Sequence, residues 1–125
     1  MLNVKKILTK ILKSLAVIEN LGTGVTLIRV SNLRILCLNH FQGANSTLTI
    51  PTADRPSSPV SAPTLRMDEN NRSTAMGYMT VNASNGYVQR YYAGTYNAAG
   101  SGVSNIGATD RSSGIIAWIV GGGTT

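Results

Sequence analysis

Few residues in this sequence could perform acid–base, nucleophilic or metal chemistry. His40 is the single histidine, and the acids number five: Glu19, Asp54, Asp68, Glu69 and Asp110. A Ser-His-Asp system would have to use His40, and the sequence holds no G-x-S-x-G turn to expose a nucleophilic serine. Asp68 and Glu69 are adjacent in a polar stretch where neighbouring side chains diverge, so a paired-carboxylate site is poorly supported. We therefore predict no catalytic residues and no enzymatic activity.

The sequence gives equally little support for a metal site or a cofactor site. Cys37 is the single cysteine, so an intrachain disulfide and a zinc site built from several cysteines are excluded. The glycine clusters at 100–102 and 121–123 lack the lysine and the helix that follow a phosphate-binding loop. The sequence thus predicts no metal and no cofactor, and Cys37, inside an apolar run, is interpreted as a small core residue.

Side chains suited to a saccharide gather mainly in the C-terminal half. A sugar presents both C–H patches and hydroxyls, which match flat rings beside amide and guanidinium groups. The candidate saccharide ligands are Tyr91, Tyr92, Tyr96, Arg90, Asn97, Trp118 and His40. Structural roles compete with this interpretation. Tyr91 and Tyr92 point to opposite faces of a strand, so one is expected in the core. Trp118 in an apolar strand favours packing, and His40 is expected at a strand end on the surface.

An amphipathic helix is the first element that would position these residues. Its apolar seam steps by four and three residues, as in the a and d positions of a heptad, and comprises Val4, Leu8, Ile11, Leu15 and Ile18. All four lysines fall on the opposite arc. Because so short a helix is marginal alone, the seam must be buried, which predicts an oligomerisation stalk over residues 1–21 with the seam as its interface. Docking on the chain's own β domain and binding to an anionic membrane surface are the alternatives.

The remaining sequence predicts a β domain over residues 22–120 and a flexible tail over 121–125. One hairpin is predicted at 24–39 with Ser31-Asn32 as its turn, and a stronger one at 75–92 with an Asn-Gly turn. Further strands are predicted at 45–50, 60–67, near 103–106, and at 114–120, the last buried on both sides. The four prolines between 51 and 63 indicate a connection between sheets. About seven short strands are typical of an antiparallel β-sandwich or barrel.

Charge and composition narrow the class of partner. The formal net charge is +6, with the lysines confined to the first 13 residues and the arginines spread singly from Arg29 to Arg111. Because no dense basic patch with interleaved aromatics results, nucleic-acid binding is not predicted. Segment 4–18 is too short and too charged to span a membrane, and it lacks the cleavage site of a signal peptide.

The order of motifs resembles a known family. Residues 22–38 form a strand pair, 48–56 hold Leu-Thr-Ile-Pro and then Arg-Pro, 79–88 carry an Asn-Gly hairpin turn, and 114–120 read Gly-Ile-Ile-Ala-Trp-Ile-Val. This order is similar to the C-terminal head domains of tail-fibre, baseplate and receptor-binding proteins from phages and prophages of Gram-positive bacteria.

The resemblance implies a sandwich or barrel head assembled as a trimer on a helical stalk. Its implied partners are other tail or baseplate proteins and host cell-wall saccharide, and its implied location is the virion, after synthesis in the bacterial host cytoplasm. A standalone protein and a piece of a longer fibre both remain open. A purely structural virion subunit and a membrane-surface protein are the other hypotheses.

Overall fold

The computed structural model describes residues 3–45, 47–67, 73–93, 103–105 and 110–121. Within these residues the chain forms one helix, α1 (Val4–Leu15), and one 3-10 turn, η1 (Thr52–Asp54). The strands are β1 (Ala16–Gly22), β2 (Val25–Val30), β3 (Leu33–Gln42), β4 (Val60–Met67), β5 (Ser73–Val81), β6 (Val88–Ala93), β7 (Val103–Asn105) and β8 (Arg111–Ile119). The protein is therefore mainly β, as predicted.

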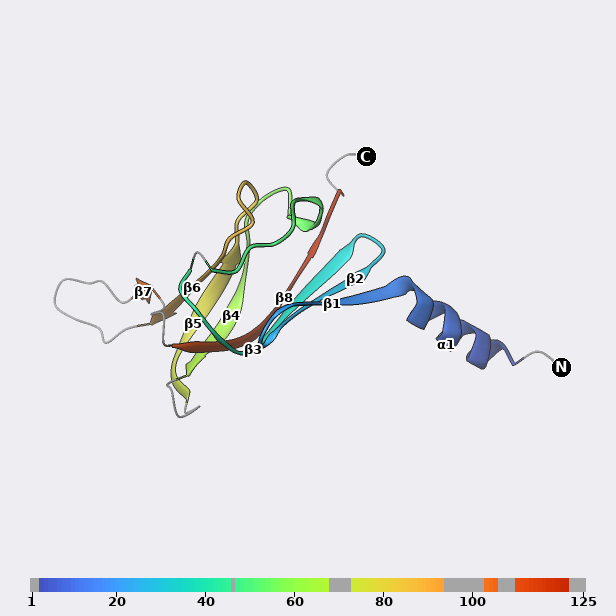
Figure 1. Cartoon of the computed structure of the whole chain (residues 1–125), viewed down its shortest axis with the longest axis horizontal. Coiled ribbons are helices and arrows are strands. Elements are labelled where there is room, and N and C mark those ends of the chain that lie inside the picture. The colour runs from blue at the N-terminus through green and yellow to red at the C-terminus, as the bar shows by residue number, and fades with distance from the viewer. Residues whose placement is uncertain (1–2, 46, 68–72, 94–102, 106–109, 122–125) are drawn as a thin grey trace.

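All the described strands belong to one antiparallel sheet in the order β1-β2-β3-β8-β4-β5-β6-β7. Strand β8 joins two parts of this sheet, with β1–β3 on one side and β4–β7 on the other (Figure 1). It pairs with β3 over most of its length but with β4 only over Leu65–Met67. The proline of β4 does not interrupt the pairing with β8, because Pro63 lies outside the stretch of β4 that bonds to β8.

One face of the sheet, called here the inner face, contributes to the core. In β2, Val25 and Leu27 are buried, and they pair with buried Leu38 and Leu36 of β3. The connection between β3 and β4 also contributes to this core. The core comprises Val25, Leu27, Leu36, Leu38, Phe41, Leu48, Ile50, Met79, Val81, Val88, Ile116, Trp118 and Val120.

Both predicted hairpins are confirmed. Strands β2 and β3 meet at Ser31-Asn32, where Ser31 adopts a φ of 52°. Strands β5 and β6 are joined by the loop at 82–87, in which Gly86 has a φ of 73°. Positive φ is what tight hairpin turns require, and glycine supplies it without steric cost. The strands predicted at 60–67 and near 103–106 are likewise present as β4 and β7.

The helix is shorter than predicted. It begins after Asn3, whose side chain accepts a hydrogen bond from the Lys6 backbone amide at 3.1 Å, and it ends at Leu15. From Ala16 onward the chain pairs with β2 instead. The prediction of a helix over residues 1–21 was therefore wrong at its end, and Ile18 is a strand residue. Sheet hydrogen bonds to a neighbouring strand outweigh local helical periodicity there, and β-branched residues such as Ile18 favour strands.

Three further predictions were wrong. Of residues 45 and 47–50, which the structure describes, none belongs to a strand, and Thr49 alone of these makes an isolated bridge, to Tyr87. Strand β8 is buried on one side only, since Ile115 is 64% exposed while its neighbour Ile116 is 2% exposed. Cys37 is half-buried on the face opposite the core. The last two errors have one cause: an apolar run does not reveal which of its faces a domain will cover.

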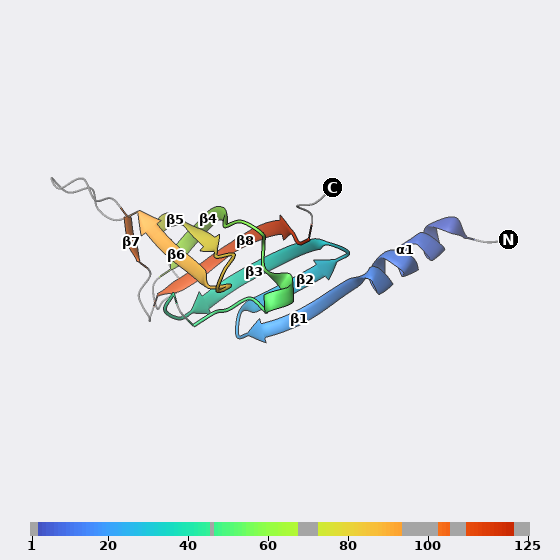
Figure 2. The same cartoon turned by 90° about the horizontal axis from the view of Figure 1, so that it is seen from above.

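The helix projects away from the sheet (Figures 1 and 2). It precedes β1 without an intervening linker and does not fold back over the β domain. Val4 and Leu8 of the predicted seam are 64% and 54% exposed. Val4 and Leu8 therefore do not pack on the chain's own β domain in this structure.

Candidate functional site

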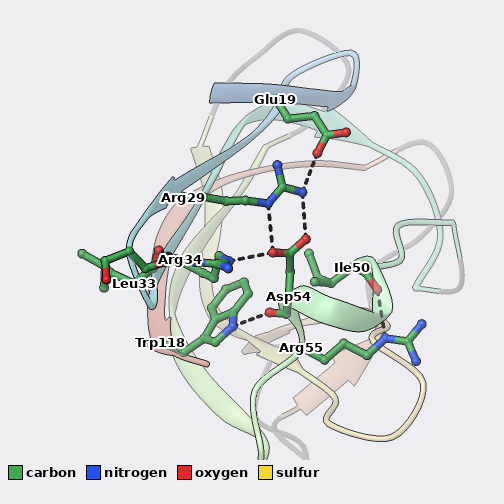
Figure 3. Close-up of polar contacts among 9 residues, drawn as sticks. Glu19, Arg29, Leu33, Arg34, Ile50, Asp54, Arg55 and Trp118 are labelled. Atoms are coloured by element: carbon green, nitrogen blue, oxygen red, sulfur yellow. Dashed lines mark hydrogen bonds and ion pairs between the residues drawn. The ribbon is translucent and has the colours of Figure 1, made fainter. Parts of the chain in front are cut away.

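The most densely bonded polar cluster surrounds Asp54 (Figure 3). Arg29, Arg34 and Trp118 are cross-strand neighbours in one row across β2, β3 and β8. The Asp54 carboxylate, carried by η1, accepts from Arg29 Nε at 2.9 Å, Arg29 Nη2 at 2.7 Å and Arg34 Nε at 2.6 Å. Its backbone carbonyl accepts from the Trp118 indole N–H at 2.7 Å. These hydrogen bonds hold the β3–β4 connection against the sheet.

The pKa shifts in this cluster indicate that its ion pairs have a structural role. The hydrogen bond from Arg29 lowers the pKa of Asp54 below its usual value, and that from Arg34 acts in the same direction against the opposing effect of burial. The same bond raises the pKa of Arg29, with Glu19 adding a second ion pair at 2.6 Å. Asp54 is only 4% exposed and both of its oxygens are occupied. A carboxylate in that state is not free to act as a base or as a saccharide ligand.

Arg55 fastens the same connection to the second hairpin. It donates from Nε to the Ile50 carbonyl at 2.9 Å and from Nη1 to the Ser84 carbonyl at 3.1 Å. The neighbouring Pro56 is buried. The Arg-Pro pair of the sequence thus has a packing role, because it links two loops that are about 30 residues apart in the chain.

Arg90 is not a surface ligand, contrary to the prediction. Its side chain is fully buried and lies 4.5 Å over the Phe41 ring. It donates from Nη2 to the carbonyls of Gly43 at 2.6 Å and Ala44 at 2.9 Å, and burial lowers the pKa of Arg90 to about 10. The inward direction follows from strand alternation, since Arg90 pairs with buried Met79. Sequence patterning failed here because arginine is rarely found buried.

Trp118 is a core residue as well, which corrects its place among the saccharide candidates. It is 5% exposed, and its single polar group is satisfied by Asp54. The structural interpretation of this residue, packing inside an apolar strand, is therefore confirmed.

Tyr91 retains a position from which it could contact a ligand. It lies on the outer face of β6 and stacks on Tyr78 of β5, with ring centroids 4.9 Å apart and planes 28° from parallel. Tyr78 is 40% exposed, and the Tyr91 hydroxyl donates to Gln89 Oε1 at 3.2 Å. The result is a pair of rings flanked by an amide. We call Tyr78 and Tyr91 the tyrosine pair.

The other candidates are dispersed. Tyr92 lies on the opposite face from Tyr91, as expected, with the Arg66 guanidinium 4.4 Å over its ring. His40 is exposed at an irregularity of β3 and adopts a φ of 53°. Tyr96 and Asn97 lie outside the described residues. Among the predicted ligands that the structure describes, Tyr91 alone joins a second aromatic ring on an accessible face, that of Tyr78.

Sequence reasoning missed Tyr78 as a candidate. The residue sits in the strand opposite Tyr91, and only the register of the hairpin places the two rings side by side. A two-residue Asn85-Gly86 turn would have set Tyr91 opposite Thr80, whereas the observed register pairs Val81 with Val88 and Tyr91 with Tyr78. No signal in the sequence therefore pointed to Tyr78.

Over the ranges described, no three His, Cys, Asp or Glu side chains are grouped as a metal site would need. In that same part of the chain, no helix has the length and apolar character needed to cross a membrane.

Comparisons of the sequence with models of protein families and with curated proteins, and of the fold with solved structures, find no match.

Proposed function

We propose that this chain is a receptor-binding head of a phage or prophage tail or baseplate, acting in the virion as a self-associated, non-enzymatic β domain that recognises host cell-surface saccharide. In this proposal the β domain is a sandwich or barrel head, and the amphipathic helix α1 is the stalk of a homo-oligomer, most simply a trimer. The observation that carries the proposal is the tyrosine pair, with Tyr78 exposed and Tyr91 half-buried, on the outside of a sheet whose opposite face forms the core.

Stacked rings on a rigid hairpin suit a sugar for two reasons. The C–H face of a pyranose packs on a flat aromatic surface, and neighbouring amide groups pair with its hydroxyls. Gln89 supplies an amide within 3.2 Å of the Tyr91 hydroxyl. Both tyrosines sit in paired strands, so little conformational entropy is lost on binding.

The projecting helix supports the stalk. The seam residues Val4 and Leu8, and Ile7 beside them on the helix, are exposed, so a single chain leaves them in water. Heptad spacing favours burial against the same helix in other copies. A repeated head would also multiply weak saccharide contacts into firm attachment to a cell wall.

The saccharide test uses the full chain on a glycan array and on isolated Gram-positive cell walls. Tyr78→Ala and Tyr91→Ala are expected to weaken binding by about fivefold each, since a ring contact contributes about 1 kcal/mol. Asn39→Ala is the matched control, because Asn39 is exposed on β3, a strand that pairs with neither β5 nor β6. Binding that is absent in the unaltered chain would instead favour a purely structural virion subunit.

The stalk test must keep residues 16–22, because they form the edge strand β1. Leu8→Asp places charge on the exposed seam, whereas Lys10→Asp places it on the polar arc. Light scattering should show that Leu8→Asp lowers the oligomer mass and that Lys10→Asp does not. A membrane-surface role predicts a different result: co-sedimentation of the unaltered chain with anionic liposomes, abolished by Leu8→Asp.

A further inference from the structure

The face of β1, β2, β3 and β8 opposite the core is almost wholly apolar. Register places its side chains in three rows across the four strands. We call these the outer rows: Ala16–Val30–Leu33–Ile119, Ile18–Ile28–Ile35–Ala117 and Asn20–Thr26–Cys37–Ile115. Ten of the twelve side chains are apolar or a thiol, and none is charged.

Three charged residues of these strands alternate onto the inner face, where Arg29 and Arg34 bind Asp54 and Arg29 also binds Glu19. Arg111, at the start of β8, lies beyond the end of the outer rows. Several outer-row residues are conspicuously exposed, with Ile18 at 69%, Ile115 at 64% and Ile119 at 54%. A contiguous apolar surface of this kind on a folded domain marks an interaction site.

The position of Ile18 indicates the occupant. Ile18 continues the spacing of the helical seam, yet it lies on β1 in the middle outer row. No residue separates α1 from β1, so the seam runs directly onto the sheet. Parallel association of α1 with the same helix of another copy would therefore bring the outer rows of the two copies near each other.

Size supports a joint interface. With strands about 4.8 Å apart and same-face residues about 7 Å apart, the outer rows cover only a few hundred Å². A stable specific interface needs about 800 Å² from each partner. The outer rows alone fall short of that, but the helical seam leads directly into β1, the edge strand that begins each outer row, so one apolar surface extends from the helix onto the sheet. A second copy of the chain presents the same extended surface and can match both parts at once.

We propose that the outer rows pack against the outer rows of a second copy of this chain, next to the contact between the helices. This inference rests on the self-association in the proposed function but not on saccharide recognition. The uncharged rows exclude salt bridges across their centre, so contact there depends on apolar packing and is insensitive to salt.

The test compares two neighbouring residues of β1 in the full chain. Ile18→Glu adds a charge to the outer rows, and Val17→Glu adds the same charge to the inner side of the same strand, where the residue is 53% exposed. Ile115→Glu repeats the test on β8. Sedimentation equilibrium should show association weakened at least tenfold by Ile18→Glu and Ile115→Glu, and by no more than twofold by Val17→Glu.

A second measurement leaves the sequence unaltered. Cys37 lies in an outer row and is half-buried. The rate of its reaction with a thiol reagent therefore measures whether another copy of the chain covers that row. The rate should fall at least fivefold as protein concentration rises through the association range. This readout stands even where a glutamate variant fails to fold, which circular dichroism would show.

The outcomes separate the two proposals. A monomeric unaltered chain overturns both the stalk and the outer-row contact. Oligomers lost in Leu8→Asp but kept in Ile18→Glu and Ile115→Glu, with Cys37 labelled at a constant rate, overturn the outer-row contact alone. Oligomers weakened by the outer-row variants, with Cys37 protected, support the inference whether or not the chain binds a saccharide.

Discussion

The indole N–H of Trp118 donates to the backbone carbonyl of Asp54 at 2.7 Å, although 64 residues separate the two in the chain. The bond joins β8 to the 3-10 turn η1. Beside it, the Asp54 carboxylate joins the same turn to β2 and β3 through Arg29 and Arg34. These contacts hold the irregular β3–β4 connection on the core, where it contributes Leu48 and Ile50. The stability of the domain should therefore depend on this small cluster.

Trp118→Phe tests the indole bond. The substitution leaves the Asp54 carbonyl buried without its donor and removes part of a core ring, so we expect a loss of about 2 kcal/mol in the free energy of unfolding. Urea titration followed by circular dichroism gives the value. Tyr87→Phe, at a residue 36% exposed, serves as control and should change stability by less than about 0.5 kcal/mol. Equal stabilities for the two variants would contradict a structural role for the bond.

Asp54→Asn tests the ion pairs. The amide keeps the size of the side chain but removes the charge that faces two half-buried guanidinium groups, and a loss of about 3 kcal/mol is expected. Glu19→Gln is the matched control. Glu19 pairs with Arg29 at a similar distance but is 46% exposed, so its loss should cost under about 1 kcal/mol. The prediction fails if both substitutions cost the same.

The pH dependence of stability follows from the lowered pKa of Asp54. Its ordinary value is about 3.8, and the folded protein holds it lower through the bond from Arg29. Between the two values the unfolded chain binds more protons, so stability rises with pH. The contribution of Asp54 is complete above about pH 4 and is lost as pH falls through the folded-state value. Thermal unfolding from pH 6 to pH 2 should show this fall, and Asp54→Asn should flatten it.

Local chemistry was enough to predict most of the strands. Turn residues with positive φ, such as Gly86, fix where a hairpin reverses, and alternation then places Tyr91 and Tyr92 on opposite faces. The boundary between α1 and β1 was not predictable in this way. Residues 16–18 continue a helical spacing, and only pairing with β2 makes them a strand.

The candidate site was harder to predict than the fold. Arg90 and Trp118 have the side chains of a saccharide site, but both are buried and bonded inside the protein. Residue type indicates what a group can bind, whereas its accessibility depends on which face of the strand turns toward the core. That face is decided by elements far away in the chain.

The amino-acid sequence by itself determined the β content, both hairpin turns and the apolar seam, because these depend on neighbours within a few residues. The tertiary structure alone decided that Asp54 would meet Arg29, Arg34 and Trp118, and that the outer rows would lie uncovered opposite the core. The physical reason is that strand pairing brings together residues as distant in the chain as Leu33 and Ile119, and only the completed sheet has two faces that can differ in what covers them.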